Sequence, residues 1–162
     1  MNPTDLPIEK KPLMHCTVGE FLHVLASDAM LPGAGAAGGM ALALAAACAG
    51  KAVAITRRHG DSTVLAYLQT QLADLTASAL VLAENDALQF KRQLESDDPA
   101  EASALLRTDL TILDACSTLD KLLNDNGHHI ADNMTGDWNA ARALSHACRV
   151  IHEENVRGLK DT

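Results

Sequence analysis

The feature that most constrains this chain is an uncharged run from Ala29 to Gly50, which is 22 residues long and consists mainly of Ala and Gly. On length alone such a run could span a bilayer. Ala and Gly gain little free energy on transfer into hydrocarbon, however, and Lys51, Arg57 and Arg58 follow at once. We therefore interpret the run as a small-residue helix surrounded by other helices, in a protein without a membrane span.

The rest of the chain also favours helices. Aromatic residues make up only 2% of the sequence, and β-branched residues are sparse beside Ala and Leu, which is a poor composition for strands and a good one for helices. With 162 residues, of which 48% are hydrophobic, the chain is long enough for one domain with a sizeable core. We expect residues 17–162 to form a single all-α domain, an antiparallel bundle of about five helices with the Ala/Gly-rich helix at its centre, and residues 1–16 to form a flexible arm.

Local signals predict where the helices begin and end. Thr17 and Glu20 have the spacing of a capping box. Asp61 or Ser62 can cap the third helix, and Asp98, which a proline follows, can cap the fourth. The predicted helices cover about residues 17–30, the glycine-rich stretch to residue 58, 63–95, 99–123 and 137–157.

Charge and cysteine usage exclude several classes of function. The net charge is −8, and no run of basic residues with interleaved aromatics occurs, so we expect no nucleic-acid partner. The cysteines are far apart in sequence, without a C-x-x-C pair, and the charged N-terminus does not have the pattern of a secretory leader. We interpret them as reduced thiols of a cytoplasmic protein; they are Cys16, Cys48, Cys116 and Cys148.

Gly33, Gly35 and Gly38 spell G-x-G-x-x-G, the pattern of a dinucleotide-binding turn. That turn needs a buried strand before its first glycine, whereas the segment that precedes Gly33 has the pattern of an amphipathic helix. The glycines therefore belong to a turn between two helices. Exposed N–H groups there can receive an anion or a polar edge of a ligand. The alternative, close packing of helices at small residues, remains open.

Polar residues interrupt two apolar stripes. In the third predicted helix the stripe continues through Asp86 to Phe90, and a carboxylate on a buried seam is a candidate site residue with a raised pKa. In the fifth, Asp137 and Asn155 lie at the two ends of such a stripe. The alternatives are a stripe that drifts to the surface at Asp86, an N-cap role for Asp137 and a helix end at Asn155. The leading members of the first stripe are Val64, Leu68, Leu72, Leu75, Ala79 and Leu82.

Histidines give weaker indications. Asp125, His128, His129 and Asp132 have helical spacing and metal-type side chains, but an Asn-Gly pair lies among them, so we interpret the segment as a solvated loop and expect no metal site. His146 and His152 are six residues apart and face different sides of a helix. No Ser-His-Asp or Cys-His arrangement follows from these spacings.

Three stretches of the sequence together resemble the formiminotetrahydrofolate cyclodeaminase and methenyltetrahydrofolate cyclohydrolase family. They are "FLHVLASDAMLPGAGAAGGMALALAAACAGKAVAIT", "ENDALQF" and "GDWNAARALSHACRVIHEENVRGL", and the likeness covers about residues 17–159. The family motif P-G-G-G-S is matched at Pro32, Gly33 and Gly35, while Ala34 and Ala36 stand in place of a glycine and the serine. Its Asp-Ala-x-x-Phe is matched from Asp86 to Phe90, and its later Asp and Asn-Val are matched at Asp137, Asn155 and Val156.

The resemblance implies a folate-binding, all-α protein that forms a homodimer or a higher homo-oligomer. A tetrahydrofolate derivative would be its substrate, with no separate cofactor, and Asp86 and Asp137 would carry protons in hydrolysis of the methenyl bridge or in cyclodeamination. Arg157 would meet the glutamate tail of the folate. The alternative is a family member that binds a ligand or a protein without turnover. The residues implied to contact the substrate are Pro32, Gly33, Ala34, Gly35, Ala36, Thr56, Asn155 and Arg157.

Overall fold

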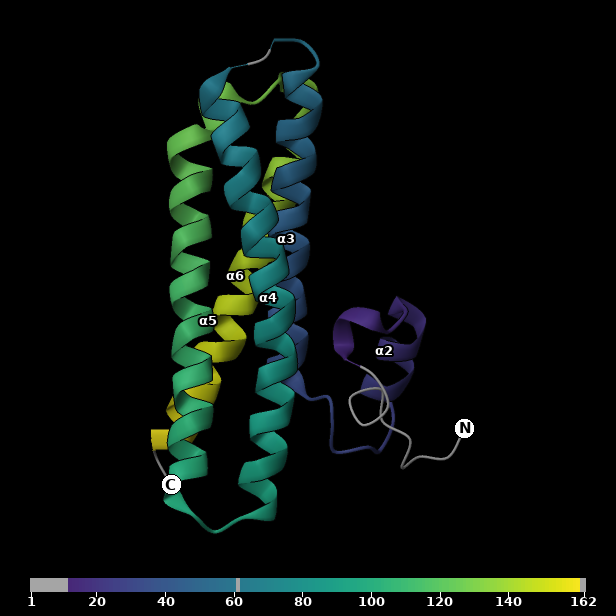
Figure 1. Cartoon of the computed structure of the whole chain (residues 1–162), viewed down its shortest axis with the longest axis vertical. Helices are drawn as coiled ribbons and strands as arrows, with labels where there is room; N and C mark the ends of the chain where they lie inside the picture. Colours follow the sequence, from purple (N-terminus) through teal and green to yellow (C-terminus); the bar gives the residue numbers. More distant parts are fainter. Residues whose placement is uncertain (1–11, 61, 161–162) are drawn as a thin grey trace.

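The computed structural model describes residues 12–60 and 62–160 of the chain. Over these residues the chain forms α-helices and short 3-10 turns without a strand, so the predicted all-α fold is confirmed. Four long helices lie side by side, and a short helix stands apart near the start of the chain (Figure 1). The helices are α2 (Val18–Leu25), α3 (Ala34–Arg57), α4 (Thr63–Glu95), α5 (Pro99–Asn126) and α6 (Thr135–Lys160), and the 3-10 turns are η1 (Leu13–His15), η2 (Gly127–His129) and η3 (Asp132–Met134).

The predicted helix caps are present. Thr17 and Glu20 make both bonds of the capping box, with Thr17 N–H donating to Glu20 Oε2 at 2.6 Å and Glu20 N–H to Thr17 Oγ1 at 3.1 Å. Ser62 accepts from the N–H of Leu65 at the start of α4, and Asp98 caps α5. Asp61, the other predicted cap of α4, lies outside the described residues.

The end of the first helix differs most from the prediction, whereas α5 and α6 extend two or three residues beyond their predicted ends. The first predicted helix was expected to run to Met30, but α2 ends at Leu25. Both the N–H and the hydroxyl group of Ser27 donate to the carbonyl oxygen of Val24, and these bonds close the last turn. The remaining residues before α3 therefore form a loop.

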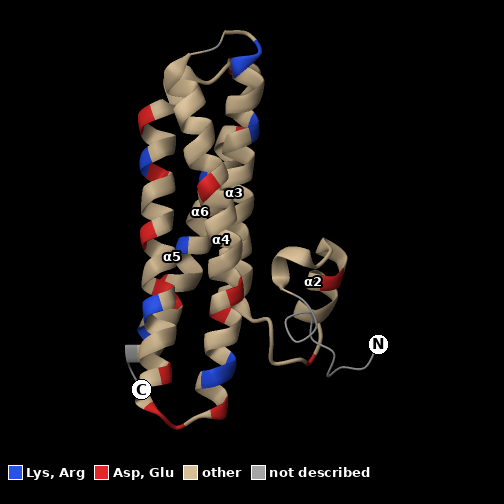
Figure 2. Ribbon diagram, viewed as in Figure 1, with Lys and Arg blue, Asp and Glu red and all other residues tan. Residues whose placement is uncertain are grey.

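The four long helices make an antiparallel bundle in which α3 packs against α4 and α6, and α5 closes the opposite side. Small residues let α3 and α4 approach closely: a Cβ on Gly39 would overlap the backbone of Ala83. By length and composition α3 alone among the described helices is apolar enough to cross a membrane, and half of its most apolar window is buried inside the bundle. Charged residues are sparse along α3 (Figure 2).

The start of the described chain packs on the bundle through a second, smaller apolar cluster. Leu13 in η1 and Phe21 in α2 contact this cluster, whose bundle members are Ala36, Ala83 and Ala87. Residues 1–11 of the predicted flexible arm lie outside the described residues, whereas Leu13 is 2% exposed. The cluster therefore anchors the chain beside the N-terminus of α3.

Candidate functional site

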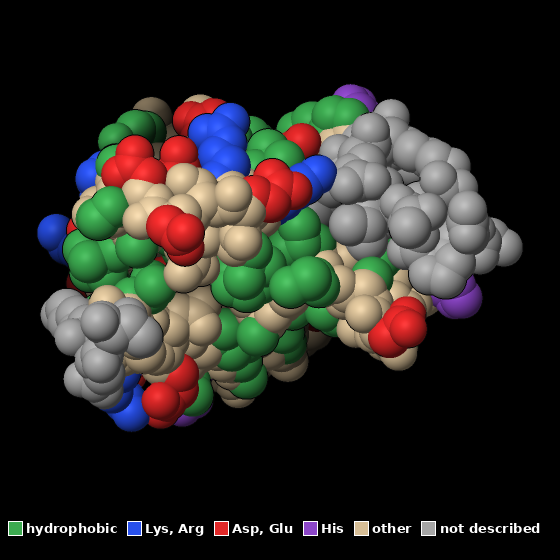
Figure 3. Space-filling model, turned by 90° about the horizontal axis from the view of Figure 1, so that it is seen from below, with side chains coloured by type: hydrophobic (Ala, Val, Ile, Leu, Met, Phe, Trp, Pro, Cys, Tyr) green, Lys and Arg blue, Asp and Glu red, His purple; other side chains and the backbone are tan. Residues whose placement is uncertain are grey.

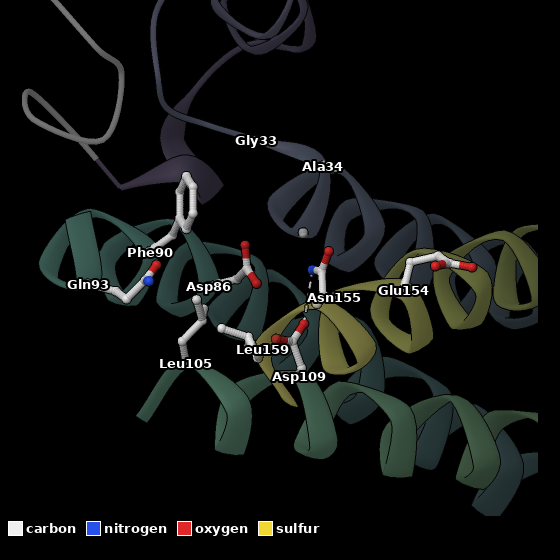
Figure 4. Close-up of a pocket in the computed structure, with 12 residues that line it drawn as sticks. Gly33, Ala34, Asp86, Phe90, Gln93, Leu105, Asp109, Glu154, Asn155 and Leu159 are labelled. Atoms are coloured by element: carbon white, nitrogen blue, oxygen red, sulfur yellow. Dashed lines mark hydrogen bonds between the residues drawn. The ribbon is translucent and has the colours of Figure 1, made fainter. Parts of the chain in front are cut away.

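A pocket opens at the end of the bundle where α3 begins and α6 ends. Its volume is about 470 Å³, which lies within the range of small-molecule sites. Seen from this end, apolar side chains gather in the middle of the bundle, with charged groups around them (Figure 3). All four long helices contribute to the walls (Figure 4). The lining residues are Gly33, Ala34, Gly35, Asp86, Phe90, Gln93, Leu105, Asp109, Glu154, Asn155, Gly158 and Leu159.

Asp86 projects from α4 into this pocket and is only 4% exposed. The apolar stripe therefore does not drift to the surface before Asp86, as one alternative had it. No hydrogen-bond partner for its Oδ1 atom lies among the described residues. Burial, reinforced by the negative charge of Asp109, raises the pKa of Asp86 to about 6, although His152 acts in the opposite direction. A carboxyl group with such a pKa can give or take a proton near neutral pH.

Asp109 and His152 form a fully buried pair behind Asp86. His152 Nδ1 and Asp109 Oδ1 are 2.6 Å apart, and Asn155 Nδ2 donates to the same oxygen at 3.1 Å. Since a carboxylate oxygen only accepts, Nδ1 is the donor in this bond. Figure 4 shows Asp109 beneath Asn155 and facing the same space as Asp86. The pocket therefore contains two carboxyl groups from two helices, with an imidazole behind one of them.

Sequence reasoning missed this pair, although half of its signal was present. Asp109 lies on an apolar stripe of α5 with the same alternating steps of four and three residues that singled out Asp86. Spacing within one helix compares His152 only with His146, whereas its partner in the fold, Asp109, is 43 residues away in sequence. The buried members of that stripe are Leu105, Asp109, Ile112, Cys116, Leu119 and Leu123.

Two glycines of the G-x-G-x-x-G pattern hold α3 against these ionisable side chains. A Cβ on Gly35 would overlap the carboxylate of Asp86, and a Cβ on Gly38 would overlap the imidazole of His152. Gly33 is the N-cap residue of α3, without a side-chain cap. Close packing, the alternative left open, therefore accounts for Gly35 and Gly38, and Gly33 lies in the pocket wall.

The structure brings together part of the predicted site. Gly33, Ala34, Gly35, Asp86 and Asn155 all line the pocket. Asn155 does not close a helix, because α6 continues to Lys160. Two further members of the glycine-rich loop, Pro32 and Ala36, are buried but outside the pocket lining.

Ala36 does not reach the pocket because its side chain packs into the smaller apolar cluster with Phe21 and Ala83. Arg157 is also outside the lining: it is exposed and pairs with Glu154, N to O 2.6 Å, at the pocket wall.

Asp137 and Thr56 lie in the opposite half of the bundle. Asp137 and Asn155 are 18 residues apart on α6, which is about 27 Å along a helix axis. Asp137 pairs with Lys51 at 3.2 Å, and Thr56 Oγ1 accepts from the N–H of Ala131 at 3.1 Å. Nor is Asp137 the N-cap, since α6 begins at Thr135; it lies in the first turn, where a negative charge is favourable. In one chain, therefore, Asp137 and Asp86 do not share a site.

Two groups of side chains in the described structure are of the types that bind metal ions. The residues of the predicted loop, from Asp125 to Asp132, include His128 and His129, whose side chains are exposed. Asp86, Asp109 and His152 each offer a ligand atom, and these atoms lie within 4.8 Å of one another. The 2.6 Å separation of His152 Nδ1 and Asp109 Oδ1 is that of a hydrogen bond. The hydrogen bond favours an acid–base cluster, and the absence of a metal stays a prediction.

The charge of the pocket indicates what it can attract. Asp86, Asp109 and Glu154 line it, whereas its described lining includes no Lys or Arg. Phe90, Leu105 and Leu159 supply apolar surface. The pocket therefore suits a partly apolar ligand that is cationic or rich in hydrogen-bond donors.

Comparison with known proteins shows the fold. No family model matches the sequence, and no curated protein matches it. Among solved structures, the chain is similar to a formiminotetrahydrofolate cyclodeaminase from Thermotoga maritima, with a TM-score of 0.82 and 18% sequence identity, over 91% of this chain and 80% of that one. The likeness shows that the two proteins share a fold.

Proposed function

We propose that this chain acts in folate one-carbon metabolism, either hydrolysing 5,10-methenyltetrahydrofolate or cyclodeaminating 5-formiminotetrahydrofolate. The fold shared with a formiminotetrahydrofolate cyclodeaminase supports this class of substrate. The observation that carries the proposal is the buried carboxyl group of Asp86 in the wall of a pocket of about 470 Å³, with a pKa raised to about 6.

The charge of the reacting group matches the charge of the pocket. The methenyl substrate has a cationic N5–C–N10 bridge, and the formimino group is also cationic when protonated. A pocket lined by Asp86, Asp109 and Glu154 stabilises such a cation. The apolar side chains of Phe90, Leu105 and Leu159 offer contacts for the flat pterin ring. The anionic glutamate tail would extend out of the pocket towards Arg157, which is exposed.

Asp86 carries the proton in the proposed reaction. In hydrolysis, a water oxygen bonds to the bridge carbon while the Asp86 carboxylate accepts a proton from that water. The carbon–N5 bond then breaks as the new hydroxyl group loses its proton to form the formyl carbonyl, N5 receives a proton, and the formyl group remains on N10, so that one proton is released overall. In cyclodeamination, N10 bonds to the formimino carbon and loses its proton, and ammonia leaves after gaining one. Neither route changes an oxidation state, so a redox cofactor is not required.

The remaining expectations belong to the same proposal. The protein would work in the cytoplasm as a homodimer or higher homo-oligomer, with folate as its small-molecule partner. The alternative is a member that binds its ligand without turnover. That alternative is favoured by the position of Asp137, because the second carboxylate implied by the family resemblance lies outside the pocket of the same chain.

Incubation of the purified chain with each substrate tests the proposal. Near-ultraviolet absorbance falls as the methenyl compound is hydrolysed and rises as it is formed from the formimino compound, when ammonia is also released. We expect a protein-dependent rate with one of the two substrates. Binding of either compound without a rate above buffer would favour the ligand-binding alternative, and neither binding nor turnover would contradict the proposed class of substrate.

A further inference from the structure

The proposed reaction needs two proton transfers, and the pocket holds one titratable pair beyond Asp86. Asp109 lines the pocket from α5, and His152 lies behind it on α6. Both side chains are fully buried. Asp137, the second proton carrier implied by the family resemblance, is about 27 Å from Asn155 along α6. Asp109 and His152 are therefore the groups that can act on Asp86 within one chain.

The hydrogen bonds of Asp109 involve one of its two carboxylate oxygens. Its Oδ1 atom accepts from His152 Nδ1 at 2.6 Å and from Asn155 Nδ2 at 3.1 Å. Its Oδ2 atom has no partner among the described residues, and the same is true of His152 Nε2. A buried polar atom without a partner costs free energy, which indicates that a ligand or a proton transfer uses it.

The charges around Asp86 come from the bundle helices, because the cluster that η1 and α2 form with α4 consists of apolar side chains. From α3 the neighbour is Gly35, which carries none. From α5 comes Asp109, and from α6 come His152 and, at the pocket wall, Glu154, whose charge is paired with Arg157. The electrostatic surroundings of Asp86 are therefore dominated by the Asp109 carboxylate and by the imidazole bound to it.

We propose that Asp109 and His152 control the protonation of Asp86: when the two carboxyl groups hold one proton between them, it resides on Asp86 and Asp109 is the anionic acceptor, while His152 is a positioning residue that holds Asp109 in place. One carboxylate oxygen of Asp86 and one of Asp109 lie within 4.8 Å of each other, and two carboxyl groups this close do not readily ionise together, so the second of them keeps its proton to a higher pH. Because both N–H donors converge on Asp109, the proton stays on Asp86, which faces the substrate. For its part in turnover, this pair rests on the proposed folate function.

The protonation of Asp86 can be followed without any substrate, by carbon NMR of carboxyl-labelled aspartate during a pH titration, with Asp86→Asn identifying the signal. Asp109→Asn keeps the size of the side chain and an oxygen acceptor but removes the negative charge, so we expect the midpoint of Asp86 to fall by about half to one pH unit. His152→Gln removes the imidazole donor to Asp109 Oδ1, so Asp109 competes better for the proton and we expect the midpoint of Asp86 to fall as well. Asp114→Asn is the control, because Asp114 is an exposed residue on α5, the helix of Asp109, and we expect this change to leave the midpoint of Asp86 unchanged.

The outcomes separate this proposal from the folate function. A fall of the Asp86 midpoint in both Asp109→Asn and His152→Gln supports the pair even if no folate compound is turned over. A midpoint within about 0.2 pH unit of the unmodified chain in Asp109→Asn, or a rise of the midpoint in His152→Gln, overturns it even if turnover is found. If His152→Gln does not fold, Asp109→Asn decides alone. In an active protein the acidic limb of the pH–rate profile moves with these midpoints, and kcat changes more than KM.

Discussion

At the scale of single residues, burial of Asp86 has a consequence for stability. The folded chain binds the Asp86 proton more tightly than the unfolded chain does, since its pKa is about 6 rather than 3.8. This contribution to the free energy of unfolding is fully present below pH 3.8 and is lost as the pH rises to about 6. The difference between the two pKa values corresponds to about 3 kcal/mol.

Asp86→Asn removes this pH dependence because an amide does not titrate. We predict that the free energy of unfolding of Asp86→Asn, relative to that of the unmodified chain, rises by about 2–3 kcal/mol between pH 4 and pH 7. Urea unfolding at a series of pH values measures the difference, and other carboxyl groups cancel in it. A difference that stays constant over this range would show that Asp86 titrates like an exposed aspartate.

Helix periodicity predicts which site residues are buried but not which of them contact one another. A stripe with steps of four and three residues identified Asp86 from its own helix, because burial on one face of a helix is a local property of the sequence. The same stripe exists around Asp109 on α5. His152 and Asp109 are joined by a contact between two helices, however, and the relative register of two helices is set by packing that spacing within one helix does not contain.

At the scale of helices, Gly35 links the packing of α3 to the pocket. We predict that Gly35→Ala destabilises the fold by about 1–3 kcal/mol and lowers ligand affinity, because the added Cβ overlaps the Asp86 carboxylate. Gly136→Ala is the matched control: no atom lies within 4 Å of its added Cβ, and alanine favours a helix. Thermal melting and ligand titration of the two variants check this, and equal effects in both would refute a specific contact at Gly35.

Helix boundaries were largely predictable, whereas the role of the glycines was not. Caps at Thr17, Ser62 and Asp98 depend on bonds within three residues, so the sequence contains them. The glycine-rich loop has two physical uses, ligand access and close packing, and the choice depends on what faces it. Asp86 and His152 come from α4 and α6 to face Gly35 and Gly38, which only the assembled bundle reveals.

At the scale of the whole molecule, the apolar exposed side of α3 supports the proposed homodimer. Leu44 is 54% exposed, and Ala47, one turn further along, lines a shallow groove shared by α3 and α4. We predict that light scattering after size-exclusion chromatography gives twice the chain mass of 17.1 kDa. Leu44→Glu would give a monomer, because it places a charge on this face, while Leu110→Glu on α5 would not. A monomeric unmodified chain would contradict the prediction.

The bundle also separates two groups of residues that the family resemblance assigned to one site. The pocket contains the glycine turn, Asp86 and Asn155, whereas Asp137 and Thr56 lie in the other half. Both groups have members on α3 and α6, but within each of these helices the members of the two groups are many residues apart. Their separation follows from helix length, because residues that are many turns apart on a straight helix lie at opposite ends of the molecule.

The proposed function is tested most directly by the initial rate of methenyltetrahydrofolate hydrolysis or of cyclodeamination. The rate is measured for three proteins at equal concentration: the unmodified chain, Asp86→Asn and Asp114→Asn. We predict a rate above buffer for the unmodified chain, a loss of at least about 100-fold in Asp86→Asn, and a rate within about twofold of the unmodified chain for the exposed Asp114→Asn. No rate above buffer, or equal rates in the two variants, would contradict the claim that Asp86 is the acid–base group of a folate enzyme.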